Sequence, residues 1–238
     1  MTVHAIIQAR MGSTRLPGKV MMDIIGKPAI WHLVNQLNYS KNIDGIILAT
    51  TDQRLDDPLY EYAIKQKWNV YRGSEDDVLD RYYKAAISNG CTNCDAIVRC
   101  TGDDILWDPE IVDQLIELYL GNIPEVKHVS NNRIPTFPYG SDIEVFSFDA
   151  LEKAWREAKL PAEREHVTPY IRNHPEYFPF LDIKYHKDLS HIILSIDTHE
   201  NLEFNRDLFH KLYEKNMPPF HLKDILKCIN KYGITQSV

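Results

Sequence analysis

Near its start the chain reads VHAIIQARMGSTRLPGK over residues 3–19, and the rest of the architecture can be worked out from this stretch. Its first part, Val3 to Ile7, is an apolar run that predicts a buried β-strand. The loop that follows, from Ala9 to Lys19, carries three cations, two glycines and two hydroxyl side chains. Glycines let backbone N–H groups turn towards an anion, and clustered arginine and lysine neutralise it. Because an α/β sheet usually binds nucleotides where a strand leads into such a loop, we expect a phosphate site here.

The spacing within this loop excludes two familiar phosphate motifs. A Walker A site needs four residues between its glycines and a Ser or Thr after its lysine. Here five residues separate Gly12 from Gly18, and Val20 follows Lys19. The GxGxxG spacing of a dinucleotide fold is also absent from the loop. A solvated basic turn is the alternative, but so many cations on a chain with a net charge of −7 favour an anion site.

Apolar runs alternate with amphipathic stretches along most of the chain, which predicts βαβ units in an α/β fold with a mainly parallel sheet flanked by helices. We expect strands at Val3–Gln8, Gly45–Thr51, Trp68–Tyr71, Ala96–Thr101, Val126–Ser130, Ile143–Phe148, Phe180–Lys184 and His191–Ser195. We expect helices at Pro28–Asn38, Pro58–Lys67, Val78–Ser88, Pro109–Leu120, Phe148–Ala158, Glu163–Asn173, Glu200–Tyr213 and Leu222–Asn230. Residues 131–140, rich in Pro and Asn, predict a loop.

Length and composition favour one large domain over residues 1–238. A hydrophobic fraction of 44% is enough for a substantial core. The net charge of −7 argues against broad binding to nucleic acid or anionic membranes, because phosphate contacts need a basic face. We expect no signal peptide and no membrane span, since no apolar run approaches the roughly 20 residues that a span needs. A cytoplasmic protein is therefore expected.

The chain has four cysteines, Cys91, Cys94, Cys100 and Cys228. The spacing of the first two is formally that of a zinc or redox pair. No second CxxC and no HxxxH partner accompanies it, so we expect free reduced thiols.

Two aspartates follow predicted apolar strands. Asp103 comes after residues 96–101, and Asp197 comes after residues 192–196. A carboxylate at the carboxyl end of a strand is well placed to hold a hard cation against a triphosphate, and both strands could end at one edge of the sheet. Helix N-capping is the alternative for each, because Asp is a preferred N-cap and helices are predicted after both positions.

A second group of polar residues lies in the C-terminal half. Asp142 and Glu144 alternate on a predicted strand and so share a face. A buried pair of carboxylates is costly unless it binds a cation or a donor-rich ligand. His166 is a candidate general base, with a packed or capping histidine as the alternative.

The stretch from Ile6 to Lys19 resembles the signature of the spore-coat polysaccharide cytidylyltransferase-like proteins, which are related to the CMP-sialate and CMP-KDO synthetases. Further matching motifs follow in the expected order at Arg72–Tyr82, Thr101–Asp103, Asp142–Ser147, Glu163–Tyr170 and Ser195–Thr198. The resemblance covers nearly the whole chain, and the order of the motifs makes it far more specific than any one of them.

This resemblance implies the nucleotide-diphospho-sugar transferase architecture, which is Rossmann-like, with a small dimerisation element at about residues 131–190. It implies an enzyme that transfers CMP from CTP to an acidic sugar and releases pyrophosphate. The activated sugar would serve a surface polysaccharide such as that of a spore coat. The expected cofactor is Mg²⁺, and the expected assembly is a homodimer.

The resemblance also assigns residues. The expected nucleotide-binding residues are Ala9, Arg10, Gly12, Ser13, Thr14, Arg15, Lys19, Arg72 and Thr101. The expected acceptor-binding residues are Asp142, Glu144, Arg164 and His166. Asp103 and Asp197 are the expected metal ligands, and Arg10, Arg15, Lys19 and Asp103 the expected catalytic residues. For Arg72, a surface ion pair with Glu75 or Asp76 is the alternative.

The chain departs from the family pattern at two places. Asp104-Ile105-Leu106 stands where a proline is common, and Asp197-Thr198-His199-Glu200 stands where Asp-Thr-Pro-Glu is common. Neither departure removes an expected ligand. The first adds charge near the expected metal, so the identity of the acceptor does not carry over from the family.

Two other functions compete with this one. A glycosyltransferase would use residues 101–104, Thr-Gly-Asp-Asp, as its metal motif and a sugar nucleotide as donor. The loop from Arg10 to Lys19 argues against it, because a diphosphate donor needs fewer cations than a triphosphate. The other alternative is a catalytically weak nucleotide-binding subunit of a glycan pathway. The presence of every expected phosphate and metal residue argues against that.

Overall fold

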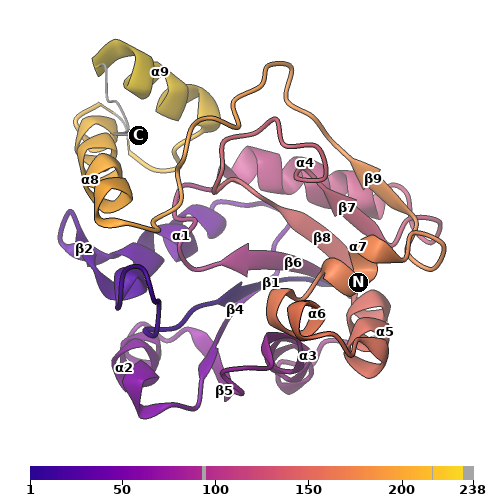
Figure 1. The fold of residues 1–238 in the computed structure, drawn as a ribbon. Coiled ribbons are helices and arrows are strands. Elements are labelled where there is room, and N and C mark those ends of the chain that lie inside the picture. The colour runs from indigo at the N-terminus through magenta and orange to yellow at the C-terminus, as the bar shows by residue number, and fades with distance from the viewer. Residues whose placement is uncertain (93–94, 216, 233–238) are drawn as a thin grey trace.

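The computed structural model describes residues 1–92, 95–215 and 217–232. Within them a seven-stranded sheet has the order β5-β4-β1-β6-β8-β7-β9, and Figure 1 shows it crossing the molecule. The strands are β1 (Val3–Gln8), β4 (Gly45–Thr51), β5 (Asn69–Gly73), β6 (Ala96–Thr101), β7 (His128–Ser130), β8 (Glu144–Ser147) and β9 (Phe180–Asp182).

The central strand β1 pairs in parallel with β4 on one side and β6 on the other. The pairs β4–β5 and β7–β9 are also parallel, whereas β8 runs antiparallel to β6 and β7. The expected mainly parallel sheet is therefore confirmed. Since neighbouring parallel strands end at one edge, the segments that follow β1, β4 and β6 lie close together.

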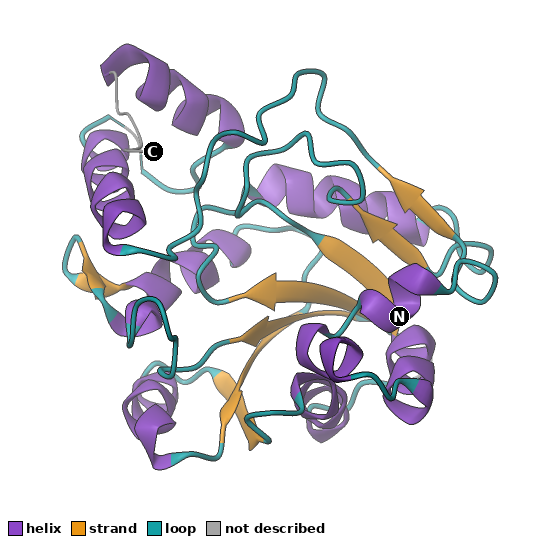
Figure 2. Cartoon of the chain, in the orientation of Figure 1, coloured by secondary structure: helices purple, strands orange, loops and turns teal. Residues whose placement is uncertain are grey.

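Helices cover both faces of the sheet (Figure 2). They are α1 (Ala29–Leu37), α2 (Asp57–Lys65), α3 (Val78–Ser88), α4 (Pro109–Leu120), α5 (Phe148–Glu157), α6 (Pro161–His166), α7 (Pro169–Asn173), α8 (His199–Tyr213) and α9 (Leu222–Tyr232). Ala5 and Ile7 of β1 pack in the cluster that contains α1 and α4, while Ile6 packs in the cluster that contains α3 and α5. A strand buried on both faces reads as a continuous apolar run, which explains why β1 was recognisable.

The predicted strand at His191–Ser195 is wrong. These residues are extended, and Leu194 N donates to Tyr139 O at 2.7 Å, but they form only one isolated bridge, between Tyr139 and Ile193. The adjacent Gly140 has a φ of 92°, and a Cβ there would lie 2.5 Å from Ser195 N, so this crossing requires glycine. The segment before Asp197 is therefore held by a short contact between two loops, at Tyr139 and Ile193, and not by a ladder of β-strand hydrogen bonds.

The predicted helix at Glu163–Asn173 is two helices, α6 and α7. The break falls at Val167, which is buried and has a φ of 69°. The sequence analysis also missed the small hairpin of β2 (Asp23–Ile24) and β3 (Lys27–Pro28).

Cys91, Cys100 and Cys228 are free thiols, whereas Cys94 lies outside the described residues. None of the helices in the described ranges has the length and apolar character needed to cross a bilayer. The assignment of residues 131–190 to a dimerisation element stays a prediction.

Candidate active site

The loop after β1 folds back on itself. Gly18 N donates to Met11 O at 2.8 Å, and Met11 N donates to Asp56 Oδ1 at 2.5 Å. Gly18 has a φ of 75°, a left-handed conformation that glycine adopts without steric cost. A short 3-10 helix, Lys19–Met21, begins directly after it. This turn buries Lys19, which is 9% exposed.

Two carboxylates meet at the edge of the sheet where β1 and β6 end. Asp103 follows β6 and Gly102, whose N donates to Gln8 O at 2.9 Å. Ile196 N donates to Asp103 O at 3.0 Å, which fixes the segment before Asp197 to the backbone at Asp103. Residues almost a hundred positions apart are thereby brought together.

Lys19 joins these carboxylates. Its Nζ lies 2.5 Å from Asp103 Oδ2 and 2.9 Å from Asp197 Oδ1, and Arg15 Nη2 lies 2.8 Å from the same Asp197 oxygen. Burial lowers the pKa of Lys19, but the two carboxylates outweigh it and the pKa is raised. Lys19 is therefore a protonated cation held between two carboxylates.

Helix capping does not explain these aspartates. The N-cap of α8 is Thr198, whose side chain accepts from the backbone of that helix. The N-cap of α4 is Asp108, whose side chain does the same. The capping alternative for Asp103 and Asp197 is thus wrong, because other residues cap the helices that follow them.

A cavity of about 270 Å³ opens over the loop after β1. Of the expected nucleotide-binding residues, it is lined by Ala9, Arg10, Ser13, Thr14, Arg15, Lys19 and Thr101, together with Asp103. It is also lined by Gln8, Val20, Val78, Arg81, Gly102, Glu165 and His166. We call it the nucleotide cavity, because the loop cations and both hydroxyl residues gather in it.

An adjoining cavity of about 510 Å³ lies on the other side of Asp103. It is lined by three of the expected acceptor residues, Asp142, Glu144 and His166. Its other lining residues are Gln8, Arg15, Arg99, Thr101, Asp103, Asp104, Asn132, Tyr139, Thr168, Pro169, Arg172, Ser195 and Asp197. We call it the acceptor cavity. Both cavities share Gln8, Arg15, Thr101, Asp103 and His166.

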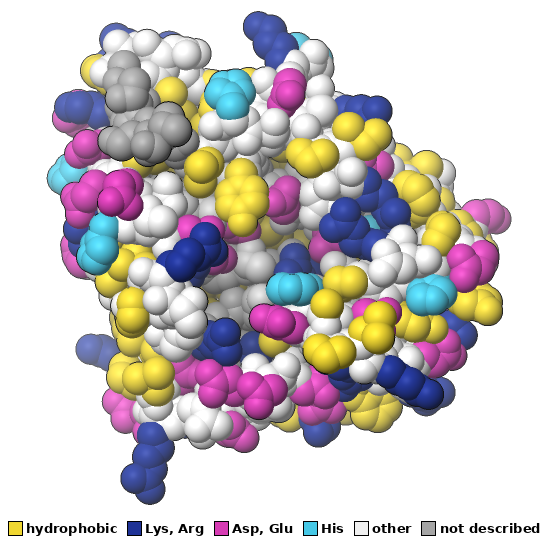
Figure 3. Space-filling model, viewed as in Figure 1, with side chains coloured by type: hydrophobic (Ala, Val, Ile, Leu, Met, Phe, Trp, Pro, Cys, Tyr) yellow, Lys and Arg dark blue, Asp and Glu magenta, His cyan; other side chains and the backbone are white. Residues whose placement is uncertain are grey.

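The view in Figure 3 looks onto this region. A hollow lies near the middle of that face, and Lys or Arg side chains, acidic side chains and a histidine surround it. Opposite charges are thus mixed around one opening, on a protein whose net charge is negative.

Glu144 is fixed at the base of the acceptor cavity by three partners. Arg99 Nη1 lies 3.4 Å from Glu144 Oε2, Thr168 Oγ1 donates to the same oxygen at 2.9 Å, and His128 Nε2 lies 3.2 Å from Oε1. Burial raises the pKa of Glu144, but His128 and Arg99 outweigh it and bring the pKa to about 2. Glu144 is therefore an ionised anchor for the cavity wall.

Two further carboxylates of the acceptor cavity, Asp104 and Asp142, have raised pKa values. Burial, followed by the charge of Asp103, raises the pKa of Asp104 to about 8. Burial, followed by the charge of Glu144, raises the pKa of Asp142. Asp104 and Asp142 are therefore costly to ionise without a ligand that supplies donors or positive charge.

Arg72 does not line either cavity among the described residues. Its guanidinium donates to Asp57 Oδ1 at 2.7 Å and to two backbone carbonyls, those of Thr51 and Gln53. The alternative pair with Glu75 or Asp76 is not seen among the described residues, and the expected nucleotide contact of Arg72 stays a prediction. Arg72 instead ties the end of β5 to the start of α2.

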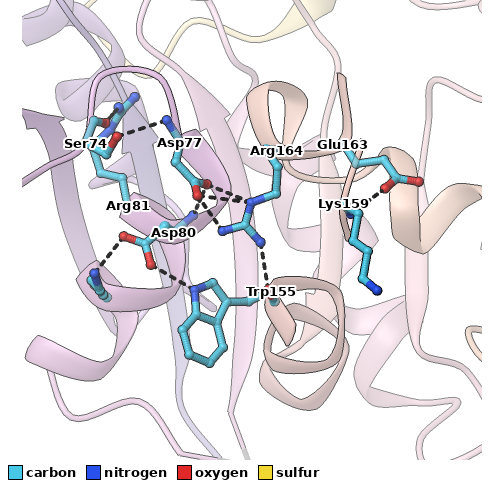
Figure 4. A network of polar contacts seen from close by, with 9 residues as sticks. Ser74, Asp77, Asp80, Arg81, Trp155, Lys159, Glu163 and Arg164 are labelled. Carbon is cyan, nitrogen blue, oxygen red and sulfur yellow. Dashed lines mark hydrogen bonds and ion pairs between the residues drawn. The ribbon is translucent and has the colours of Figure 1, made fainter. Parts of the chain in front are cut away.

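Arg164 is not among the lining residues of the acceptor cavity, and Figure 4 shows its guanidinium directed towards Asp77 and Trp155. Its guanidinium forks onto Asp77, with Nη2 at 2.6 Å and Nε at 3.0 Å from the carboxylate, and Nη1 donates to Trp155 O at 2.7 Å. This contact joins α6 to the start of α3. The observed contacts of Arg164 are structural, and its expected role in acceptor binding stays a prediction.

Gly12 also lies outside both linings, and its place in the loop is beside Glu75 Oε1, 3.5 Å from where a Cβ would be. That glutamate pairs with Arg10 Nη1 at 3.2 Å. A Cβ at Gly12 would thus make only an ordinary contact with the partner of a lining residue, and the nucleotide role of Gly12 stays a prediction.

Sequence reasoning missed several lining residues of the two cavities, including the charged residues Arg81, Arg99, Glu165 and Arg172. Arg99 interrupts the apolar strand Ala96–Thr101, and a charged residue inside a buried strand is a signal that could have found it. Arg172 gave no comparable signal, because it stands in an ordinary amphipathic helix.

A model of the family described as cytidylyltransferase matches residues 4–225. The chain belongs to this family. The match covers both cavities and all the expected nucleotide and metal residues, so the nucleotidyltransferase fold and enzyme class expected from the sequence are confirmed.

Individual relatives agree with this assignment. The cytidylyltransferase chain is 34% identical to the spore coat polysaccharide biosynthesis protein SpsF of Bacillus subtilis (strain 168), over 95% of this chain and 93% of that protein. It is 36% identical to a 3-deoxy-manno-octulosonate cytidylyltransferase of Trichlorobacter lovleyi, over 51% of this chain and 46% of that protein. The solved structure of a cytidylyltransferase from Leptospira borgpetersenii superposes with a TM-score of 0.92 at 35% identity, covering 100% of this chain and 98% of that one.

Proposed function

We propose that this cytidylyltransferase transfers CMP from CTP to an acidic sugar and releases pyrophosphate, and that the product supplies a surface polysaccharide. One observation carries the proposal: the loop cations and the pair Asp103 and Asp197 meet where two cavities adjoin. A triphosphate and its acceptor could occupy neighbouring cavities, so that the reacting atoms are held together.

In the proposed reaction, an acceptor hydroxyl oxygen forms a bond to the α-phosphorus of CTP. The bond from that phosphorus to the oxygen bridging to the β-phosphate breaks, and pyrophosphate leaves with that oxygen. The hydroxyl proton is lost to solvent. Arg10, Arg15 and Lys19 would neutralise the β- and γ-phosphates, because catalysis of phosphoryl transfer is chiefly positioning and charge stabilisation.

The residues at the sheet edge suit a magnesium ion. Asp103 and Asp197 present carboxylate oxygens, the donors that Mg²⁺ prefers, and both already converge on one positive group, the ammonium of Lys19. We propose that these two carboxylates hold Mg²⁺ in the reaction. When bound, the ion supplies polarisation of the α-phosphate and neutralises the charge that develops on the leaving group.

One cationic residue of the acceptor cavity, Arg172, supports an acidic sugar. Arg172 is half-buried, and its guanidinium has no hydrogen-bond partner in the part of the chain that the structure describes. A carboxylate is the group that an arginine binds with two parallel hydrogen bonds. The relative from Trichlorobacter lovleyi is named for an acidic sugar, 3-deoxy-manno-octulosonate, which makes this compound the first acceptor to test.

The deciding experiment measures pyrophosphate release from each of the four NTPs with Mg²⁺ and a panel of acidic sugars. Release from CTP alone with one sugar supports the proposal and identifies the acceptor. Nucleotide binding without turnover on the whole panel would favour the catalytically weak subunit. Stabilisation by sugar diphosphates, and not by CTP, would favour the glycosyltransferase.

We also propose that the enzyme acts in the cytoplasm as a homodimer. Its large exposed apolar side chains include Ile134, Tyr177 and Phe180, which are 49%, 55% and 39% exposed, and all three fall within residues 131–190. Phe180 begins β9, an edge strand of the sheet. Light scattering coupled to size exclusion tests the dimer, and a monomer at micromolar concentration would contradict it.

A further inference from the structure

Two buried amide oxygens in the acceptor cavity have no donor. Gln8 Oε1 and Asn132 Oδ1 are both buried and without a hydrogen-bond partner among the described residues. Both residues line the acceptor cavity, and Gln8 also lines the nucleotide cavity. An unsatisfied buried polar atom costs about 1–3 kcal/mol, so each one in a native protein calls for an explanation.

Gln8 is held at the boundary between the two cavities. It is the last residue of β1, its register partner on β6 is Thr101, and its carbonyl accepts from Gly102 N at 2.9 Å. These backbone contacts fix its Cα directly beside the segment that carries Asp103. The amide of Gln8 therefore belongs to the wall on which the two substrates would meet.

Asn132 lies in the loop after β7, beside an asparagine with a different role. The side chain of Asn131 donates to Ser141 O and accepts from Ile143 N, both at 2.8 Å, and so ties this loop to the start of β8. Asn131 thus supplies the side-chain hydrogen bonds that hold this loop to β8. The side chain of Asn132 makes none of these bonds and instead lines the acceptor cavity.

Gln36 shows how the fold can satisfy a buried amide. Gln36 of α1 is 2% exposed, and its side chain donates to Trp107 O and Phe220 O and accepts from Phe220 N. Asn205 of α8 is fully buried and also leaves Oδ1 without a partner among the described residues, but it lines neither cavity. Gln8 and Asn132 differ from all three other amides, because each combines an unpartnered oxygen with a place in the cavity lining.

We propose that Gln8 and Asn132 bind hydroxyl groups of the acceptor, an inference that rests on the proposed function and identifies the acceptor as a polyhydroxylated sugar. The amide oxygen of Gln8 accepts a hydrogen bond from the attacking hydroxyl. This orients the hydroxyl so that a lone pair of its oxygen points to the α-phosphorus. Asn132 accepts a hydrogen bond from a second hydroxyl in the acceptor cavity. A neutral amide suits this position, because a carboxylate would repel both the triphosphate and an acidic sugar.

The first test compares the melting temperatures of four ligand-free variants. Gln8→Met and Asn132→Leu remove an unsatisfied amide, so these variants should melt at or above the temperature of the unsubstituted protein. The matched controls Gln36→Met and Asn131→Leu break satisfied hydrogen bonds and should melt about 5 °C lower. A similar fall in all four would assign Gln8 and Asn132 a structural role and overturn the proposal.

The second test is kinetic, with CTP and 3-deoxy-manno-octulosonate as substrates. Gln8→Met should lower kcat/KM for the acceptor about 100-fold, and Asn132→Leu should raise the acceptor KM at least about tenfold. The Kd for CTP should stay within about threefold in Asn132→Leu, because Asn132 lines the acceptor cavity and not the nucleotide cavity. Unchanged acceptor kinetics, or a fall in CTP affinity that accounts for the whole loss, would overturn the assignment.

These tests separate this inference from the proposed function. If the unsubstituted protein releases no pyrophosphate with any acidic sugar, the proposed acceptor class fails. The melting comparison needs no acceptor, and it decides the role of the amide pair independently.

Discussion

Lys19 Nζ lies 2.9 Å from Asp197 Oδ1, although 178 positions separate the two residues in the sequence. The loop after β1 supplies the ammonium, and the segment held by Asp103 O supplies the carboxylate. The sequence suggested two separate motifs, a phosphate loop with Lys19 and a metal site with Asp103 and Asp197. In the structure their charged side chains form one set of ion pairs.

Lys19→Met should destabilise the protein. Both aspartates would lose a buried cation, and breaking such a pair costs about 3–5 kcal/mol. Denaturant unfolding measures the loss. The matched control is Lys153→Met, which breaks an exposed pair with Glu157 on α5 and should cost less than about 1 kcal/mol. Equal effects of the two substitutions would contradict the central role of Lys19.

Asp103→Asn should lower turnover about 100-fold or more, since it removes charge stabilisation of the reaction and not a nucleotide contact. The Kd for CTP, measured without Mg²⁺, should change little. Asp207→Asn, an exposed change on α8, serves as the control. Full turnover by the Asp103 variant would show that the metal assignment is wrong.

Arg15→Ala should weaken CTP binding about tenfold, because it removes one charge-assisted contact to phosphate. Calorimetry measures the change. Arg156→Ala is a close control, since the Arg156 and Arg15 side chains are 63% and 64% exposed and each pairs with one carboxylate. Unchanged affinity in the Arg15 variant would reject its phosphate role.

Arg164→Met should lower the free energy of unfolding by about 1–3 kcal/mol, because Asp77 would lose its fork of hydrogen bonds. The Kd for CTP and the acceptor KM should not change, since Arg164 lies outside both cavity linings in the described structure. Urea unfolding and steady-state kinetics separate the two effects. A raised acceptor KM at unchanged stability would restore the role in acceptor binding that the motif predicted.

Glu144→Gln should destabilise the protein by about 3 kcal/mol at neutral pH, because Arg99 and His128 would lose a buried anionic partner. Its pKa of about 2 lies below the ordinary 4.5, so the ionised form stabilises the fold. That stability is fully present above pH 4.5 and is lost as the pH falls towards 2. The difference between the two proteins should therefore shrink in acid. A difference that stays constant down to pH 3 or so would refute the ionised anchor.

Much of the fold could be predicted because its central strands are buried on both faces. β1, β4 and β6 were predicted with their observed bounds, since each is mainly apolar, although Arg99 interrupts β6. The later strands are short, and β9 was predicted two residues too long. Extended loops such as His191–Ser195 carry the same apolar pattern as a strand, and only the tertiary structure shows that no ladder forms.

The candidate site likewise has residues that could be predicted from the sequence and residues that could not. Asp103 could be placed at the sheet edge because β6, which precedes it, was predictable from the sequence. Asp197 was expected after a strand that does not form, and it reaches the same edge through the contact of Ile196 N with Asp103 O. The partners of Arg72 and Arg164 were not predictable, since either guanidinium could reach several carboxylates. The two amides, Gln8 and Asn132, gave no signal, because only burial and missing partners distinguish them from ordinary polar residues.

The break between α6 and α7 limits which substitutions the acceptor cavity tolerates. Val167 is a buried, β-branched residue with a φ of 69°, a conformation that is unfavourable for such a side chain. Its neighbours, His166 and Thr168, both line the acceptor cavity. Pro169 begins α7 and would not fit the interior of a continuous helix, so the turn at Val167 sets how these two side chains lie relative to one another. The chain thus keeps an unfavoured backbone at one residue, and substitutions that relax it gain local stability at the expense of the shape of the cavity.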